Sequence, residues 1–582
     1  MGKTLKKPML LLLVTLLSSL AWSKNSKVAA DTPTDDSADL VSVIVQFKQL
    51  PGDKHKNKIL AKGGSVESDL SLVKAVSGKM PKNRLRELAS DPDVAYISPD
   101  RAVQSYLDTT SAAVNAPVAW SQGWDGSGIG IAIIDSGISN HPDLKNAAGA
   151  LRVVYSQDFV GGGTDDHYAH GNHVAGIVAG NGKSSTGSTY TRTFKGIAPN
   201  ANLINLRVLD QNGHGTDSAV INAIQQAINL QAKYNIRVIN LSLGRPVFES
   251  YTQDPLCQAV EGAWKAGIVV VVAAGNEGRN NSAGTNGYGT ITAPGNDPYV
   301  ITVGAMKTMG TPSGADDLIA SYSSKGPTAI DQVAKPDLVA PGNHTVSLLA
   351  STATLPATYP NNKLPLTAYQ MTGSGALSNQ YYVLSGTSMA AATVSGAVAD
   401  LLQAQPSLTP DQVKARLMKT ACKVFPGYST VTDPATGITY IDQYDVFTIG
   451  AGYVDLQAAL ASTDVAPSGV PAKSPTVQFD SASQSVYFVA DSSAMWGSSA
   501  VWGSSAVWGS NVFVSSTSAV WGSSAVWGSS AMWGSSAVWG SSAVWGSSSL
   551  AGFSAVWGSS AVWGSSANTG AESLSVFING EE

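Results

Sequence analysis

The sequence predicts an α/β protein in which a doubly wound, mostly parallel sheet forms the main domain, residues 108–463. Between residues 128 and 404, short apolar runs that are typical of buried strands alternate with stretches of helical periodicity. The 582-residue chain is also 43% hydrophobic and only 13% charged, as expected for a globular protein with a large core. A smaller α+β unit precedes this domain, and a tryptophan-rich repeat follows it.

Several apolar runs are expected to be buried strands of the main sheet: Gly128–Asp135, Leu203–Leu209, Val238–Leu243 and Ile268–Ala274. Helical periodicity over Ser218–Lys233 and Pro410–Cys422 predicts two of the helices that accompany them. Polar residues follow several of these strands directly. Because ligands bind at the carboxyl ends of the strands in open α/β sheets, these polar residues are the candidate site residues.

The first 107 residues divide into two parts. Residues 1–23 are expected to be a signal peptide, because three lysines precede an apolar run, Met9–Ala21, that is short for a membrane span. A membrane anchor is the alternative, although polar sequence follows at once. Residues 24–107 predict the order strand, helix, two strands, helix and strand, which is a small ferredoxin-like α+β unit.

Charge is distributed unevenly along the chain. Residues 1–107 contain 16 Lys+Arg against 11 Asp+Glu, a net charge of +5, and residues 108–582 contain 20 against 30, a net charge of −10. Opposite charges favour association of the two parts, and the acidic balance of the main part argues against nucleic acid as a partner. The two cysteines, Cys257 and Cys422, permit at most one disulfide, and whether they pair is left open.

The stretch Tyr382–Gly396 contains the candidate nucleophile. A short apolar run leads into Gly-Thr, and Ser388 then opens a helix of small residues. A serine in a first helical turn lies among unpaired N–H groups, which stabilise negative charge developing beside it. Ser388 could instead be an ordinary helix cap. A cap needs no histidine or aspartate elsewhere, and both are found upstream.

Asp135 ends an apolar strand-like run, and His170 opens a second segment of small and apolar residues at helical spacing. Histidine supplies a base near neutral pH, which a serine nucleophile requires. His170 and His173, three residues apart, are also candidate metal ligands. No His-Glu-x-x-His arrangement is present and no cysteine lies nearby, so we consider zinc the weaker interpretation.

Asn276 follows the strand-like run Ile268–Ala274 in a glycine-containing turn, where its amide could be aimed into the crevice. The alternative is an ordinary left-handed turn residue. Two further loops follow predicted strands, Ser242-Leu-Gly and Asn212-Gly-His-Gly.

Four segments resemble, in order, the signature segments of the subtilisin-like serine proteases, or subtilases: Asp135-Ser-Gly, His170-Gly-Asn-His-Val-Ala-Gly, Ala274-Gly-Asn-Glu-Gly and Gly386-Thr-Ser-Met-Ala. The resemblance covers about residues 108–463, and residues 40–103 are similar to the inhibitor-type propeptide of these enzymes. One such segment is a weak signal, but four in the family's order are specific.

The resemblance implies a role for each matching residue. Ser388 would be the nucleophile, His170 its general base and Asp135 the residue that orients the imidazole. Asn276 and the N–H of Ser388 would form the oxyanion hole. The substrate would pair as an extended strand with residues on either side of the cleft: Gly213, Ser242, Leu243, Gly244 and Gly275.

Some positions depart from the family pattern. Asn172 stands where threonine is usual, and Ala392-Thr393 replaces Pro-His after the nucleophile. Asp143 matches a position that binds calcium in some relatives, but the insertion Asn181–Phe194 displaces the loop that completes that site. Calcium is therefore possible and is not required by the sequence.

The tail follows an expected linker, residues 464–491, and extends over residues 492–582. Ala-Val-Trp-Gly-Ser-Ser recurs there with a period of six, and ten tryptophans lie between Trp496 and Trp563. The repeat contains no titratable group, which argues against a catalytic role. A flexible tail and a repetitive β-structure remain open, and its expected partners are a cell surface, a polymer or another copy of itself.

Together these features predict a secreted serine endopeptidase that is made as an inactive precursor and acts on protein or peptide substrates, with its own propeptide as an intramolecular inhibitor. One alternative is a non-catalytic secreted adhesin or scaffold that uses the tryptophan repeats. Another is a lipase or esterase, whose Gly-x-Ser-x-Gly motif differs from the segment around Ser388.

Overall fold

We describe the protein from a computed structural model. The structure describes the following residues: 27–29, 32, 34–99, 109–282, 284–372, 375–433, 436–480, 485–488, 511–512 and 569–581. The expected signal peptide and, apart from two residues, the tryptophan repeats lie outside them. The chain forms two compact units, Met1–Gln104 and Ser105–Glu582.

The first unit is a four-stranded antiparallel sheet with two α-helices. Its strands are β1 (Leu40–Phe47), β2 (Ser65–Leu70), β3 (Ala75–Pro81) and β4 (Val94–Pro99), and its helices are α1 (Asp53–Leu60) and α2 (Leu85–Ala89). The strand order is β2-β3-β1-β4. Side chains along β1 alternate between the two faces of the sheet. Val43, Val45 and Phe47 share the buried face and pack in one core with Leu85 and Leu88 of α2. The elements occur in the order that the sequence predicts.

The second unit is built on a mostly parallel sheet, as the sequence predicts. Its strands are β5 (Gly130–Asp135), β6 (Val153–Asp158), β7 (Asn202–Arg207), β8 (Ile236–Leu241), β9 (Val269–Ala273), β10 (Ile301–Lys307), β11 (Leu318–Ile319) and β12 (Leu338–Pro341). The order is β11-β10-β9-β8-β5-β7-β6, and β12 also pairs with β10. Only the β10–β11 pair is antiparallel among these described strands.

The chain reverses its direction of winding at β5, which lies between β7 and β8. In the sheet, β7 and then β6 lie on one side of β5, and β8, β9 and β10 lie on the other. Such a switch point opens a crevice at the carboxyl ends of the strands. β5 ends at Asp135, so this residue lies at the crevice.

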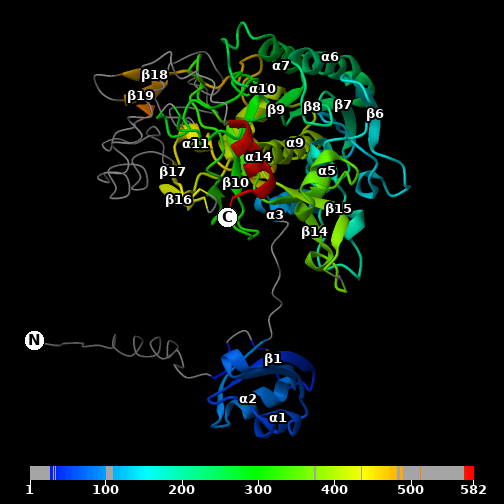
Figure 1. Cartoon of the computed structure of the whole chain (residues 1–582), viewed down its shortest axis with the longest axis vertical. Coiled ribbons are helices and arrows are strands. Elements are labelled where there is room, and N and C mark those ends of the chain that lie inside the picture. The colour runs from blue at the N-terminus through cyan, green and yellow to red at the C-terminus, as the bar shows by residue number, and fades with distance from the viewer. Residues whose placement is uncertain are drawn as a thin grey trace, which may run out of the picture. The chain divides into compact units, whose positions relative to one another are not determined.

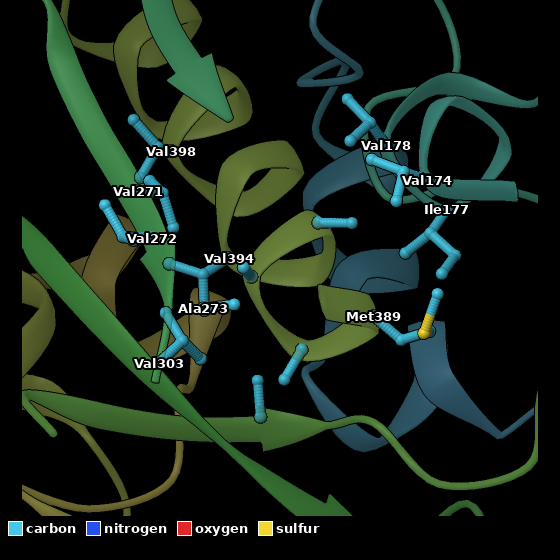
Figure 2. Packing of buried hydrophobic residues seen from close by; sticks show 14 of the residues in the cluster. Val174, Ile177, Val178, Val271, Val272, Ala273, Val303, Met389, Val394 and Val398 are labelled. Carbon is cyan, nitrogen blue, oxygen red and sulfur yellow. The ribbon is translucent and has the colours of Figure 1, made fainter. Parts of the chain in front are cut away.

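The longest buried helix is α9 (Thr387–Ala404), which lies between strands of the sheet and α5 (His170–Ala179) (Figure 2). In Figure 2, Val394 and Val398 face Val271, Val272 and Val303 of the sheet, while Met389 faces Ile177 of α5. The small residues of α9 allow the sheet and α5 to approach this helix closely. Ala392 and Thr393 are buried within an unbroken helix, so the departure from Pro-His leaves the helix intact.

The remaining α-helices of this unit are α3 (Thr110–Ala113), α4 (Ala116–Ser121), α6 (Asp217–Tyr234), α7 (Pro255–Lys265), α8 (Thr354–Thr358), α10 (Pro410–Thr420), α11 (Val446–Ile449), α12 (Leu456–Ala461) and α14 (Thr569–Asn579). Smaller sheets are formed by β13 (Thr345–Leu348), β14 (Lys363–Pro365), β15 (Leu377–Leu384), β16 (Tyr428–Thr432), β17 (Thr439–Gln443), β18 (Val477–Asp480), β19 (Ser485–Phe488) and β20 (Asn511–Val512). Among the described helices, none is long and apolar enough to cross a membrane.

The start of the expected linker packs on the main domain. The N–H of Ser474 donates to the carbonyl of Pro298 over 2.8 Å, and Ala472 is fully buried. Ser474 also joins a buried ionic cluster in which Asp337 lies between Lys335, at 2.7 Å, and Lys414, at 3.2 Å. Ala466, Ala472 and Val477 belong to the core of the main domain, so the structure places part of the expected linker within that domain.

Candidate active site

The candidate site lies at the carboxyl ends of three adjacent strands. Asp135 ends β5, Ser242 immediately follows β8, and Asn276 follows β9. The helices α5 and α9 begin at His170 and Thr387, and they pack against each other. The fold thereby brings together residues that are up to 253 positions apart in the chain, Asp135 and Ser388.

Asp135 and His170 form a buried pair. Nδ1 of His170 lies 2.7 Å from Oδ1 of Asp135. Burial alone would lower the pKa of His170, but the Asp135 carboxylate outweighs it, and the pKa is raised above its ordinary value of 6.5. The bond through Nδ1 leaves Nε2 as the nitrogen that is able to accept a proton.

Asp166 anchors the segment before His170, a role that the sequence did not reveal. Its buried carboxylate accepts hydrogen bonds from the N–H groups of Ala169 (2.7 Å) and Asn172 (2.7 Å) at the start of α5. It also accepts one from the hydroxyl of Ser136, the neighbour of Asp135. Burial raises the pKa of Asp166 despite these donors. An acidic residue shortly before a helix start was the available signal.

Ser388 occupies the first turn of α9 and is 8% exposed. Its hydroxyl donates to the carbonyl of Ser242 over 3.1 Å. The hydroxyl of Ser242 donates in return to the carbonyl of Ser388 over 2.8 Å. Ser242 therefore fixes the nucleophile candidate rather than lying only along the cleft wall.

Asn276 is held by the residue that precedes Ser388. Its Oδ1 accepts hydrogen bonds from the N–H (2.9 Å) and the hydroxyl (3.0 Å) of Thr387. The Thr387 hydroxyl also accepts from the N–H of Gly275. Fixing the oxygen in this way directs Nδ2 to the Gly386 side, where an added Cβ would lie 3.1 Å from it. Gly386 has a φ of +149°, so glycine is needed there for both reasons.

The other predicted cleft residues lie nearby. A Cβ on Gly213 would lie 2.6 Å from the ring of Tyr168, two residues before His170. Leu243 is partly buried against the core, and a Cβ on Gly244 would lie 2.5 Å from the hydroxyl of Thr292. Gly213 thus lies next to the segment that leads to His170, and Gly244 lies next to Thr292, which also adjoins Gly275.

His173 is fully buried and does not face a metal position. Its Nε2 lies 3.1 Å from the carbonyl oxygens of both Thr345 and Tyr382. Burial lowers its pKa to about 3, so it is neutral and serves as a packing and hydrogen-bonding residue. Within the described ranges, no group of three or more His, Cys, Asp or Glu residues could hold a metal ion.

The surroundings of Asp143 do not fit calcium. Its Oδ1 accepts from the N–H of Ser184 at 2.7 Å, and its Oδ2 accepts from the hydroxyl of Tyr381 at 2.7 Å. Ser184 belongs to the insertion 181–194, which fills this position with protein donors. Calcium prefers several oxygen acceptors, and the donors here already occupy both carboxylate oxygens. The two cysteines, for their part, are free thiols.

Helix α14 brings a segment from beyond the repeats to the same region, which the sequence did not predict. The ring of Phe577 lies 5.4 Å from that of His170, centroid to centroid. The N–H of Ser385 donates to the carbonyl of Phe577 over 3.0 Å. In Figure 1 this red helix lies over the second unit, near the labels of α9 and β10. The apolar cluster Leu574–Ile578 between charged residues was the available signal.

A model of the Subtilase family matches residues 126–456 of the chain. The chain belongs to the subtilase family. This subtilase is 35% identical to serine protease AprX of Bacillus subtilis over 396 residues, which are 65% of this chain and 82% of AprX. It is 32% identical to subtilisin E of the same organism over 454 residues, or 77% of this chain and 97% of that protein. The alkaline protease of Alkalihalobacillus alcalophilus is 29% identical over 429 residues, 72% of this chain and 94% of the relative.

Family membership makes this subtilase a serine endopeptidase. The adhesin and lipase alternatives are accordingly not favoured. The matched region contains all four of the predicted signature segments, from Asp135 to Ser388.

Proposed function

We propose that this subtilase hydrolyses peptide bonds by acyl transfer, with Ser388 as nucleophile, His170 as general base and Asp135 as the residue that orients the imidazole. The observation that carries this proposal is the buried 2.7 Å pair between Asp135 and His170. His170 begins α5, and α5 packs against α9, the helix that begins with Thr387-Ser388.

In the proposed reaction, the Ser388 hydroxyl leaves the Ser242 carbonyl and donates to Nε2 of His170. As the Oγ atom attacks the substrate carbonyl carbon, the proton passes to His170, whose cation the Asp135 carboxylate stabilises. His170 then returns the proton to the leaving amine, and water hydrolyses the acyl-enzyme by the same route. The charge that develops on the carbonyl oxygen is stabilised by Nδ2 of Asn276 and the N–H of Ser388.

The proposed substrate path is supported by the loops that border the site. Gly213 on one side and the segment from Ser242 to Gly244 on the other provide backbone for pairing with an extended peptide. The N–H of Gly275 donates to the Thr387 hydroxyl, which in turn donates to Oδ1 of Asn276. Calcium has no part in the proposed reaction.

We further propose that the protein is secreted as an inactive precursor. The first unit would be the inhibitor, supported by its similarity to subtilase propeptides and by the +5 against −10 charge balance noted above. The tryptophan repeats would mediate attachment to a cell surface or a polymer, or self-association, because they display aromatic side chains without opposing charge.

The test uses purified protein and an unstructured protein substrate. We expect hydrolysis by the wild-type chain and its loss after treatment with a serine-directed covalent inhibitor, with the adduct on Ser388 by peptide mass spectrometry. Ser388→Ala should abolish hydrolysis with an unchanged circular dichroism spectrum. Ser407→Ala, an exposed serine beyond the same helix, is the control and should retain full activity. Near-normal turnover in Ser388→Ala would overturn the assignment.

A further inference from the structure

The segment Leu574–Glu581, which follows the repeats, ends in a buried basic pocket. One carboxylate oxygen of Glu581 lies 2.7 Å from Nζ of Lys307, and the other accepts from Nη2 of Arg279 at 2.8 Å. The second oxygen also accepts from the N–H and hydroxyl of Ser321. The side chains of Arg279, Lys307 and Glu581 are only 7%, 6% and 2% exposed. Charge-assisted bonds in so dry an environment are among the stronger polar contacts in proteins.

The backbone of the segment is matched as closely as its carboxylate. The side chain of Asn343 donates to the Glu581 carbonyl over 2.7 Å and accepts from the Glu581 N–H over 2.9 Å. His344 lies 2.7 Å from the carbonyl of Asn579 through its Nε2. The side chain of Asn362 donates to the carbonyl of Ile578. The side chains of Asn343, His344 and Asn362 thus bind the backbone carbonyls and N–H of the end of α14, as a protein binds a peptide ligand.

Gly580 makes this approach possible. Its φ of +66° ends α14, and a Cβ there would lie 2.4 Å from the ring of His344 and 2.6 Å from the hydroxyl of Ser385. Only glycine fits both the conformation and the space. The fit at Gly580 and the carboxylate pocket are two independent observations.

The same segment covers part of the proposed catalytic centre. Phe577, Val576 and Ile578 are buried, and the Phe577 ring lies against the ring of His170. The Phe577 carbonyl takes the N–H of Ser385, three residues before the nucleophile. A substrate cannot reach this side of His170 and Ser385 while α14 is bound.

We propose that Arg279, Lys307, Ser321 and Asn343 form a binding site for an acidic residue of a peptide, and that Glu581 is its tethered occupant. Bound there, α14 competes with substrate for the surface beside His170 and Ser388. The blocking role rests on the proposed function, whereas the binding role does not.

The first test compares variants of the full chain by the rate of cleavage of a quenched fluorescent peptide at low substrate concentration. We expect Glu581→Gln and Gly580→Ala each to raise kcat/KM about tenfold or more, because the first removes the buried charge and the second adds a Cβ that clashes with His344 and Ser385. The controls are Leu574→Ala, on the exposed side of α14, and Gly469→Ala. Gly469 also has a positive φ, +77°, but has open space around it. Both controls should stay within about twofold of wild type.

The second test measures binding without catalysis. A labelled peptide of residues 569–582 is added to the Ser388→Ala, Gly580→Ala chain, and fluorescence anisotropy is recorded. We expect saturable binding, weakened about tenfold or more when Glu581 of the peptide is replaced by glutamine. This binding measurement does not depend on Ser388 being the nucleophile. It can also be made on a variant with a lower melting temperature.

If the peptide binds but neither variant raises kcat/KM, the proposal that α14 competes with substrate is wrong and the proposed binding site stands. Absence of peptide binding, together with unchanged kcat/KM in Glu581→Gln and Gly580→Ala, would overturn the whole proposal.

Discussion

The hydroxyl groups of Ser388 and Ser242 each donate to the main-chain carbonyl of the other residue. This reciprocal pair fixes the first turn of α9 to the end of β8. The acceptor of the Ser388 hydroxyl in this structure is therefore the Ser242 carbonyl. In the proposed reaction, the hydroxyl exchanges this acceptor for Nε2 of His170 before it attacks the substrate.

Asn276→Ala should lower kcat by about 100-fold to 1,000-fold, because one donor to the developing oxyanion is lost. KM should change little, since the proposed contact forms in the transition state. Steady-state kinetics on a peptide substrate provide the measurement, with the melting temperature as a check on folding. A tenfold rise in KM at constant kcat would instead assign Asn276 to substrate binding.

The acid limb of kcat/KM should have its midpoint above pH 6.5. His170 accepts a proton only when neutral, and its pKa is raised, so activity is lost as the pH falls through that value. Removing the carboxylate in Asp135→Asn should lower the pKa, because burial then acts against less opposition.

The His170 pKa is best followed by NMR titration of the imidazole in a Ser388→Ala background. Asp165→Asn, an exposed neighbour of Asp166, is the matched control and should leave the midpoint unchanged. An Asp135→Asn midpoint equal to or above that of the parent would contradict the assignment of Asp135.

Asp337→Asn should destabilise the second unit by about 3–5 kcal/mol, because Lys335 and Lys414 then lose their buried partner. Burial lowers the pKa of Lys414 to about 7, and Asp337 opposes that effect. Without Asp337 the buried lysine is more easily neutralised, so the loss should be larger at pH 6 than at pH 9. Urea unfolding at both pH values provides the measurement.

The surface pair Lys419–Asp464 supplies the comparison, since Asp464→Asn should cost no more than about 1 kcal/mol. Equal effects of the two substitutions would show that the Asp337 cluster contributes little to stability.

Precursor processing should depend on Ser388. If the first unit is removed by the enzyme itself, the Ser388→Ala chain should accumulate uncut in a host that lacks other proteases. Mass spectrometry of the purified chain identifies its N-terminus. Normal maturation of that variant would show that another protease makes the cut.

Deleting residues 513–568 should leave kcat/KM on a small peptide within about twofold and shift the protein toward monomer, as measured by analytical ultracentrifugation. The deletion retains the packed residues 464–477 as well as α14. Loss of peptide hydrolysis in a folded protein would show that the repeats contribute to the active site.

Local sequence patterns were sufficient to predict four strands of the main sheet, β5, β7, β8 and β9. Asp135 and Asn276 lie at or just past strand ends, and each such position is visible as an apolar run that stops at a polar residue. The Asp166 and Thr387 hydrogen bonds were not predictable, because they join backbone groups whose positions depend on the folded loops.

The burial of Glu581 shows another limit of prediction from sequence. Its partners Arg279, Lys307, Ser321 and Asn343 come from four different loops or strand ends, and no periodicity links them to a glutamate beyond the repeats. The same is true of Ser474, whose pairing with Asp337 places an apparent linker in the core.

The position of α14 also has a consequence for the order of events during biosynthesis. The ribosome makes the catalytic fold and the repeats before it reaches residues 569–581. Until then the basic pocket has no tethered glutamate, and the His170 side of the cleft is uncovered by α14. Under the proposed precursor function, residues 1–104 are made first and would be the inhibitor during that interval. In these proposed roles, the first unit would block the active site first and α14 would block it afterwards.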